Sequence, residues 1–152
     1  MAQKRNPEKR LEPRKKLLCE IMSPIEDIKR RLEKYPKVVF EEKENYICLL
    51  SASEAGFDVW FSENEREYTV GFSSWHEHFD KDELENALNC FSWGLSDSCR
   101  VKTYSRKGEQ YKWQVQSLEN EEWVTFSTTA RFDFSFLIKP EIEYKINRLI
   151  KS

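Results

Sequence analysis

The stretch QYKWQVQ, Gln110–Gln116, shows the cleanest strand pattern in the chain and indicates its class of fold. Tyr111, Trp113 and Val115 alternate with polar side chains, so one side of the strand is apolar and the other is polar. Such a strand is typical of an antiparallel sheet with one buried face and one face open to water. The sequence therefore predicts a sheet whose outer surface is accessible to a partner.

The segments 57–61, 68–72 and 132–138 alternate in the same way, and further short strands are predicted at residues 38–40, 46–50, 100–104 and 123–127. In contrast, Leu84–Leu95 places its apolar residues at helical spacing, with Asp80 as the expected cap and Gly94 as the expected end. Together these patterns predict an α+β fold, an antiparallel sheet of six to eight short strands with helices packed on one face.

The N-terminal region is rich in charged residues and is predicted to contain an arm and two helices. Residues 1–12 are predicted to be a disordered basic arm, and residues 13–152 a single domain. A short helix is predicted at about 14–22, and a second one begins after Ser23, with Pro24 in its first position.

The C-terminal segment allows two interpretations. After Pro140, the spacing of Ile142, Ile146 and Leu149 favours a helix, which is our prediction. The alternation of Ile142, Tyr144 and Ile146 also fits a strand.

Composition restricts the class of protein. The 152 residues contain no apolar run of the roughly 18 residues that a membrane span needs. The N-terminus is charged and no apolar stretch follows it, so no secretory signal is expected. The four cysteines show no CxxC spacing, so a cytoplasmic protein with reduced thiols is expected. Residues 1–16 carry seven basic and two acidic side chains, whereas the rest of the chain has a net charge of −7.

Four short motifs resemble a family of small uncharacterised bacterial proteins. They are WHEHF (75–79), GLS (94–96), CRVK (99–102) and YKW (111–113). The resemblance covers residues 57–126 and implies a compact bacterial domain without an established activity. Some small bacterial proteins of this build are immunity proteins encoded beside toxins, which makes an immunity-type role an analogy at the level of the fold.

A metal site is one hypothesis. If residues 74–79 form a strand, His76 and His78 project to the same face, and Asp80 is a further candidate ligand. Zn²⁺ needs three or four ligands, and no second cluster in the chain has ligand spacing. The alternative is that one histidine packs against an aromatic neighbour while the other is exposed.

The search for catalytic motifs favours a non-enzymatic protein. Cys90 or Cys99 would have to act as nucleophile with His76 or His78 as base, but Cys90 lies beside the apolar stripe of its helix. No GxSxG, phosphate-binding glycine loop or HExxH is present. No cofactor is predicted.

Two surfaces remain as candidate binding sites. Arg100, Lys102 and Lys112 share a predicted solvent-facing side and form an anion-binding candidate. The aromatic residues of those strands, Tyr111 and Trp113, fall on the opposite side, which disfavours base stacking and hence nucleic acid.

The second surface combines tryptophan with acidic turns. Trp60 is out of phase with its apolar neighbours, and Trp123 follows a turn that contains Glu119, Glu121 and Glu122. Exposed tryptophan near carboxylates is typical of a protein-binding site for a basic partner.

The sequence therefore favours a non-enzymatic protein-binding module of a bacterial cytoplasm, with another protein as partner and no membrane. The alternatives are a metal-dependent enzyme centred on His76 and His78, and a nucleic-acid-binding protein that uses Arg100, Lys102 and Lys112.

Overall fold

The computed structural model describes residues 22–151, so the predicted arm at 1–12 and most of the helix predicted at 14–22 lie outside the described residues. Contacts within the chain separate an N-terminal unit that ends at Pro36 from a larger unit, Lys37–Ser152. In the N-terminal unit, helix α2 spans Pro24–Leu32. The Ser23 hydroxyl oxygen accepts a hydrogen bond from the Glu26 backbone N–H at 3.2 Å, which confirms the predicted cap.

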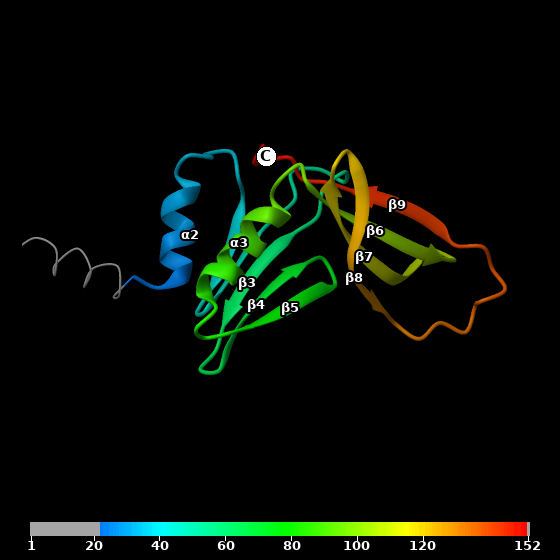
Figure 1. Cartoon of the computed structure of the whole chain (residues 1–152), viewed down its shortest axis with the longest axis horizontal. Helices are drawn as coiled ribbons and strands as arrows, with labels where there is room; N and C mark the ends of the chain where they lie inside the picture. The colour runs from blue at the N-terminus through cyan, green and yellow to red at the C-terminus, as the bar shows by residue number, and fades with distance from the viewer. Residues whose placement is uncertain (1–21, 152) are drawn as a thin grey trace, which may run out of the picture. The chain divides into compact units, whose positions relative to one another are not determined.

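The larger unit begins with a five-stranded antiparallel sheet, here called the first sheet (Figure 1). Its strands are β1 (Phe40–Lys43), β2 (Tyr46–Leu49), β3 (Val59–Glu63), β4 (Glu67–Phe72) and β5 (Trp75–Asp80). Each strand pairs with the next one along the chain. Alternate positions of the central strands are fully buried, namely Ile47, Leu49, Val59, Phe61, Val70 and Phe72. These side chains form the core of the unit.

Helix α3 (Leu84–Gly94) packs on β3, β4 and β5 and covers the buried face of the first sheet (Figure 1). It begins three residues later than predicted, with Glu83 instead of Asp80 at the N-cap position, because β5 runs as far as Asp80. The Glu83 carboxylate still accepts a hydrogen bond from the Asp80 backbone N–H at 3.0 Å. The predicted end at Gly94 is confirmed. Neither helix in the described part of the chain is long and apolar enough to cross a membrane.

A second, four-stranded antiparallel sheet follows, in the order β8-β7-β6-β9. Its strands are β6 (Cys99–Arg106), β7 (Glu109–Glu119), β8 (Glu122–Ala130) and β9 (Glu141–Lys145). The turn between β7 and β8 places Asn120 and Glu121 at positive φ, as a two-residue hairpin turn requires. The inner face of this second sheet contains the buried residues Cys99, Val101, Thr103, Trp113 and Val115.

The prediction of an α+β fold is confirmed, and the fold is rich in sheet. The described residues form two sheets of five and four strands, however, instead of the one sheet of six to eight strands that was predicted. Alternation along a strand reveals which side is buried and does not reveal which strands are neighbours. Here α3 separates β5 from β6, and β6 pairs with β7 and β9 rather than with the first sheet.

The helix predicted after Pro140 is wrong. This segment forms β9, in which Tyr144 lies opposite Lys102 and Ile142 lies opposite Tyr104. Pairing with the exposed edge of β6 satisfies backbone groups that a helix would have satisfied internally.

The strand predicted at residues 132–138 is also wrong, because this segment is a loop between β8 and β9. Arg106 holds the loop: its Nη1 contacts an Asp133 carboxylate oxygen at 2.9 Å, and its Nε donates to the Ile138 carbonyl at 2.7 Å. The Ser135 N–H donates to Asp133, which folds the chain into a turn. We call residues 132–138 the aromatic loop.

The chain after β9 ties separate parts of the larger unit together. The Asn147 side chain accepts from the Phe57 N–H at 3.0 Å and donates to the Gly94 carbonyl at 2.9 Å. Ile150 pairs with Ser96 through an isolated parallel bridge. The tail therefore joins the approach to β3, the end of α3 and the segment before β6.

Candidate functional site

The outer face of the second sheet carries a group of cationic, aromatic and amide side chains that contact one another. Strand pairing puts Lys102 opposite both Gln114 and Tyr144, and Arg100 opposite Gln116. Because alternate residues of a strand share a face, the register defines the whole set. We call it the cationic face, and its members are Arg100, Lys102, Tyr104, Lys112, Gln114, Gln116, Trp123, Thr125, Thr128, Ile142 and Tyr144.

Arg100 is held at the centre of this face by contacts on both sides of its guanidinium group. Its Cζ lies 4.4 Å from the centre of the Trp123 ring and 4.2 Å from the centre of the Tyr144 ring. Its Nε donates to the Gln116 side-chain oxygen at 2.7 Å, and the Gln116 amide donates to Thr125 at 3.2 Å. Partial burial lowers the pKa of Arg100, while Tyr144 acts in the opposite direction. An arginine nevertheless stays protonated in proteins, so this is a fixed, oriented positive charge.

Two lysines surround Tyr104. The Lys112 and Lys102 ammonium nitrogens lie 4.7 Å and 5.1 Å from the centre of its ring. The Tyr104 hydroxyl donates to the Gln114 side chain at 2.9 Å. A hydrogen bond between the Lys102 ammonium group and the Tyr104 hydroxyl oxygen is the main cause that raises the pKa of Lys102. Lys102 therefore stays charged at neutral pH. A hydrogen bond of Arg100 and the ring contacts of the two lysines thus connect the cations to neighbouring rings and amides.

The cationic face differs in charge from the unit that carries it. Residues 37–152 contain fourteen Lys and Arg against twenty-one Asp and Glu, a net charge of −7. The face itself carries three cations and no carboxylate, because Glu141 and Glu143 of β9 alternate to the other side. A local positive field on an acidic body is suited to a negatively charged partner.

The structure brings together Arg100, Lys102 and Lys112, as the sequence predicted. Sequence reasoning missed Trp123 and Tyr144 as members of this site. Trp123 had been grouped with the acidic turn, but its ring contacts Arg100. The pairing of Leu118 with Trp123 and of Gln116 with Thr125 would have located it, and such pairing follows from the hairpin turn that the sequence does indicate.

The acidic residues Glu119, Glu121 and Glu122 lie exposed at the turn between β7 and β8. Trp60 lies in β3, on the outer face of the first sheet, with ring neighbours Tyr46 and His76. The tryptophan and the acidic turn that were predicted to form one surface therefore belong to different sheets.

Trp60 lies directly against Gly71 of β4. A Cβ atom added to Gly71 would come within 1.9 Å of the Trp60 indole, so the ring occupies the space that a side chain would need. We expect Gly71→Ala to lower the free energy of unfolding by about 1–3 kcal/mol, the usual cost of overpacking. Chemical denaturation of the purified variant measures this change.

A double-mutant cycle provides the control for this prediction. In a Trp60→Ala background the clash no longer exists, so adding Gly71→Ala is expected to cost much less than in the natural chain. Equal costs in the two backgrounds would show that Trp60 does not determine the need for glycine.

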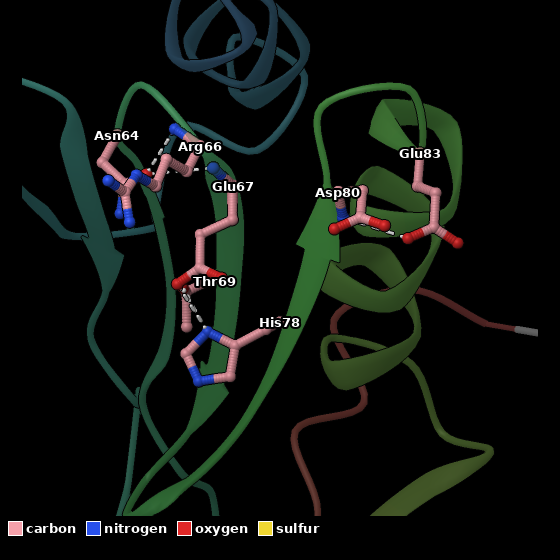
Figure 2. A network of polar contacts seen from close by, with 7 residues as sticks. All are labelled: Asn64, Arg66, Glu67, Thr69, His78, Asp80 and Glu83. Carbon is pink, nitrogen blue, oxygen red and sulfur yellow. Dashed lines mark hydrogen bonds and ion pairs between the residues drawn. The ribbon is translucent and has the colours of Figure 1, made fainter.

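The residues of the metal hypothesis lie on β5, where His76, His78 and Asp80 are all exposed. His78 points across to β4: its Nδ1 lies 2.9 Å from a Glu67 carboxylate oxygen and 3.2 Å from the Thr69 hydroxyl (Figure 2). The rings of His76 and His78 meet edge to face, with centres 5.0 Å apart.

Neither histidine joins a group with enough ligands for a metal ion within the part of the chain that the structure describes. The carboxylates that gather there are Asp80, Asp82 and Glu83, two of them exposed. His78 is instead bonded to its neighbours on β4, the arrangement of a histidine that stabilises strand pairing. The metal hypothesis thus has no additional support from this geometry.

The candidate nucleophiles are poorly suited to attack. Burial raises the pKa of Cys90 to about 12, and Glu77 adds to this effect. Burial also raises the pKa of Cys99, whose side chain is fully buried. Both remain neutral thiols at physiological pH, whereas a nucleophilic cysteine needs its thiolate form.

The motifs of the family resemblance contain residues that are central to the packing. Trp75 of WHEHF, Cys99 and Val101 of CRVK, and Trp113 of YKW are all buried. The Trp75 indole N–H also donates to Ser127 at 3.0 Å and so connects the two sheets. The buried residues of these motifs therefore have a structural role in the core of the fold. The chain matches no protein-family model, and comparison with curated proteins and with solved structures finds no similar protein.

Proposed function

We propose that the chain is a non-enzymatic protein-binding module that holds an acidic partner protein on its cationic face. The observation that carries the proposal is Arg100, fixed between the Trp123 and Tyr144 rings and bonded to Gln116. Arginine, tryptophan and tyrosine are the residue types that contribute most energy at protein interfaces. A side chain ordered before binding also loses little conformational entropy when a partner arrives.

The aromatic loop supports a protein partner. Phe132, Phe134, Phe136 and Leu137 are between 72% and 93% exposed, although Arg106 holds the loop in place. Exposed apolar clusters of this kind mark interaction surfaces. The loop joins the ends of β8 and β9, so it lies at the same end of the second sheet as Lys112 and Ile142 (Figure 1). An acidic protein with an apolar patch would complement both features.

Single-stranded nucleic acid is the second candidate, and one observation favours it. Tyr104, Trp123 and Tyr144 lie on the same face as the cations, whereas the sequence had placed only Tyr111 and Trp113, on the opposite side. Open sheets with exposed rings and cations bind unpaired bases. These rings, however, already carry the cations of the protein on their faces, and the unit is acidic as a whole, which favours the protein partner.

An affinity-capture experiment tests the two candidates together. Tagged wild-type protein, Arg100→Ala and Arg66→Ala are incubated with a lysate of the organism that encodes the chain, with and without nuclease. Arg66 is an exposed arginine of the β3–β4 hairpin and serves as a control matched for charge. Cross-linking then identifies which residues touch the retained molecule.

The proposal expects one acidic protein that wild type and Arg66→Ala retain, that Arg100→Ala loses, and that nuclease does not release. Its cross-links should map to the second sheet. Retention by Arg100→Ala at wild-type levels would contradict the proposal, and release by nuclease would favour nucleic acid. A retained toxin encoded beside this chain would place the module among immunity proteins of a bacterial cytoplasm.

A further inference from the structure

A cleft of about 680 Å³ lies at the end of the second sheet, apart from the cationic face. The β6–β7 hairpin and the start of the aromatic loop line most of it, and Ser74, from the turn between β4 and β5, contributes from the first sheet. Its volume falls within the usual range for small-molecule sites. The residues important for its chemistry are Arg106, Tyr111, Trp113, Arg131, Phe132 and Asp133.

The two arginines of the cleft have different roles. Arg106 is engaged with Asp133, with the Ile138 carbonyl and with the Tyr111 ring, whose centre lies 4.4 Å from its Cζ. Asp133 receives hydrogen bonds from the Ser135 N–H and from Arg106, and both lower the pKa of its carboxyl group. Arg106 and Asp133 are therefore both charged at neutral pH. Their opposite charges cancel, and their ion pair fixes the conformation of the aromatic loop.

The Arg131 guanidinium group is available to bind a ligand. It forms no ion pair with any residue between 22 and 151, and its Cζ lies 5.3 Å from the centre of the buried Trp113 ring. Its backbone N–H donates to the Tyr111 carbonyl at 2.7 Å, which fixes where the side chain begins. A guanidinium that is positioned in this way presents a fork of donors suited to a phosphate or carboxylate group.

Phe132 supplies an apolar wall beside this charge. Its ring meets Phe134 edge to face at 4.7 Å but is 83% exposed, so most of its surface is free to contact a ligand. Aromatic rings gain attraction from stacking in addition to the burial of their area. The lining also contains Lys107 and Glu109, so three basic side chains face two carboxylates. The cleft thus combines a net positive charge, with Arg131 outside any ion pair among the described residues, and one open ring.

We propose that this cleft binds an aromatic anion, with its phosphate or carboxylate on Arg131 and its ring against Phe132. This site shares Phe132 with the aromatic loop but includes none of the cations of the cationic face. A free metabolite and a modified side chain of another protein could both supply such a group, and the shared chemistry is a ring that bears an oxyanion.

Amide chemical shifts in two-dimensional NMR test the proposal, with phenyl phosphate as the probe. Benzoate and inorganic phosphate are titrated in parallel. We expect saturable shifts, with Kd in the millimolar range or tighter, confined to residues 106–113 and 131–135. Inorganic phosphate should bind at least about fivefold more weakly, because it lacks the ring. The stronger of the two aromatic probes identifies the preferred anion.

Variants locate the site. Arg131→Gln should weaken phenyl phosphate at least about tenfold, and Phe132→Ala should weaken it without changing inorganic phosphate, whereas Arg66→Gln should change neither. Unchanged shifts of buried amides in each variant verify that it is folded. The proposal is overturned if phenyl phosphate causes no saturable shifts, if its shifts fall on the cationic face and survive Arg131→Gln, or if inorganic phosphate binds equally well.

Discussion

Phe91→Ala is expected to lower the free energy of unfolding by about 3–5 kcal/mol, the usual cost of removing a buried phenylalanine side chain. Phe91 is 4% exposed and meets the Phe61 ring edge to face, with centres 6.3 Å apart. It is a central contact through which α3 covers the first sheet, and the rigid strands below it cannot move far to fill the space. Equilibrium denaturation in urea measures the change.

Asn89→Ala is the matched control for this prediction, because Asn89 lies on the same helix and is exposed. It should change the free energy of unfolding by no more than about 0.5 kcal/mol. A cost below about 1 kcal/mol for Phe91→Ala would mean that α3 does not seal the sheet. The two-layer arrangement of this part of the molecule would then be incorrect.

Arg100→Ala is expected to weaken binding of the captured partner by about 2 kcal/mol or more, roughly 30-fold in Kd, as for a central arginine of an interface. The variant removes the guanidinium that Trp123 and Tyr144 hold in place and that Gln116 orients. Isothermal titration calorimetry of folded wild-type and variant protein measures the difference.

Arg100→Lys separates charge from shape. Lysine keeps the positive charge but lacks the planar fork that stacks between two rings, so it should restore only a minor part of the lost affinity. Arg66→Ala should leave Kd unchanged. Full rescue by lysine would show that the face acts only through its net charge.

Much of the fold can be predicted from single segments. The alternation in QYKWQVQ correctly gives Trp113 and Val115 as buried, and the helical spacing after residue 83 correctly gives Ala87 and Phe91. These patterns depend on short-range geometry, because a strand repeats every two residues and a helix every 3.6. Local periodicity therefore identifies most of the buried positions, although Gln116, predicted on the polar side of the same strand, is buried and Tyr111 is only half-buried.

The pairing of strands distant in the sequence could not be predicted in this way. The segment Glu141–Lys145 fits either a helix or a strand, and the open edge of β6 decides the outcome. The aromatic loop alternates like a strand but has no neighbour to pair with, and Arg106 folds it differently. In both cases a long-range partner overrides the local pattern.

The candidate site shows the same limit. The three cations could be placed on one face from β6 and β7 alone. Tyr144 joins them only because β9 returns to the edge of β6, and Trp123 only because of the register of the β7–β8 hairpin. Of the two rings that hold Arg100, Trp123 can thus be placed from the register of one hairpin, whereas the position of Tyr144 depends on the complete sheet.

The hydrogen bonds of the Asn147 side chain with Phe57 and Gly94 have a consequence for biosynthesis. During synthesis the chain leaves the ribosome from its N-terminus, so all nine described strands emerge before Asn147 and Ile150 do. The hydrogen bonds to the Phe57 N–H and the Gly94 carbonyl can therefore form only after β3 and α3 have already been exposed.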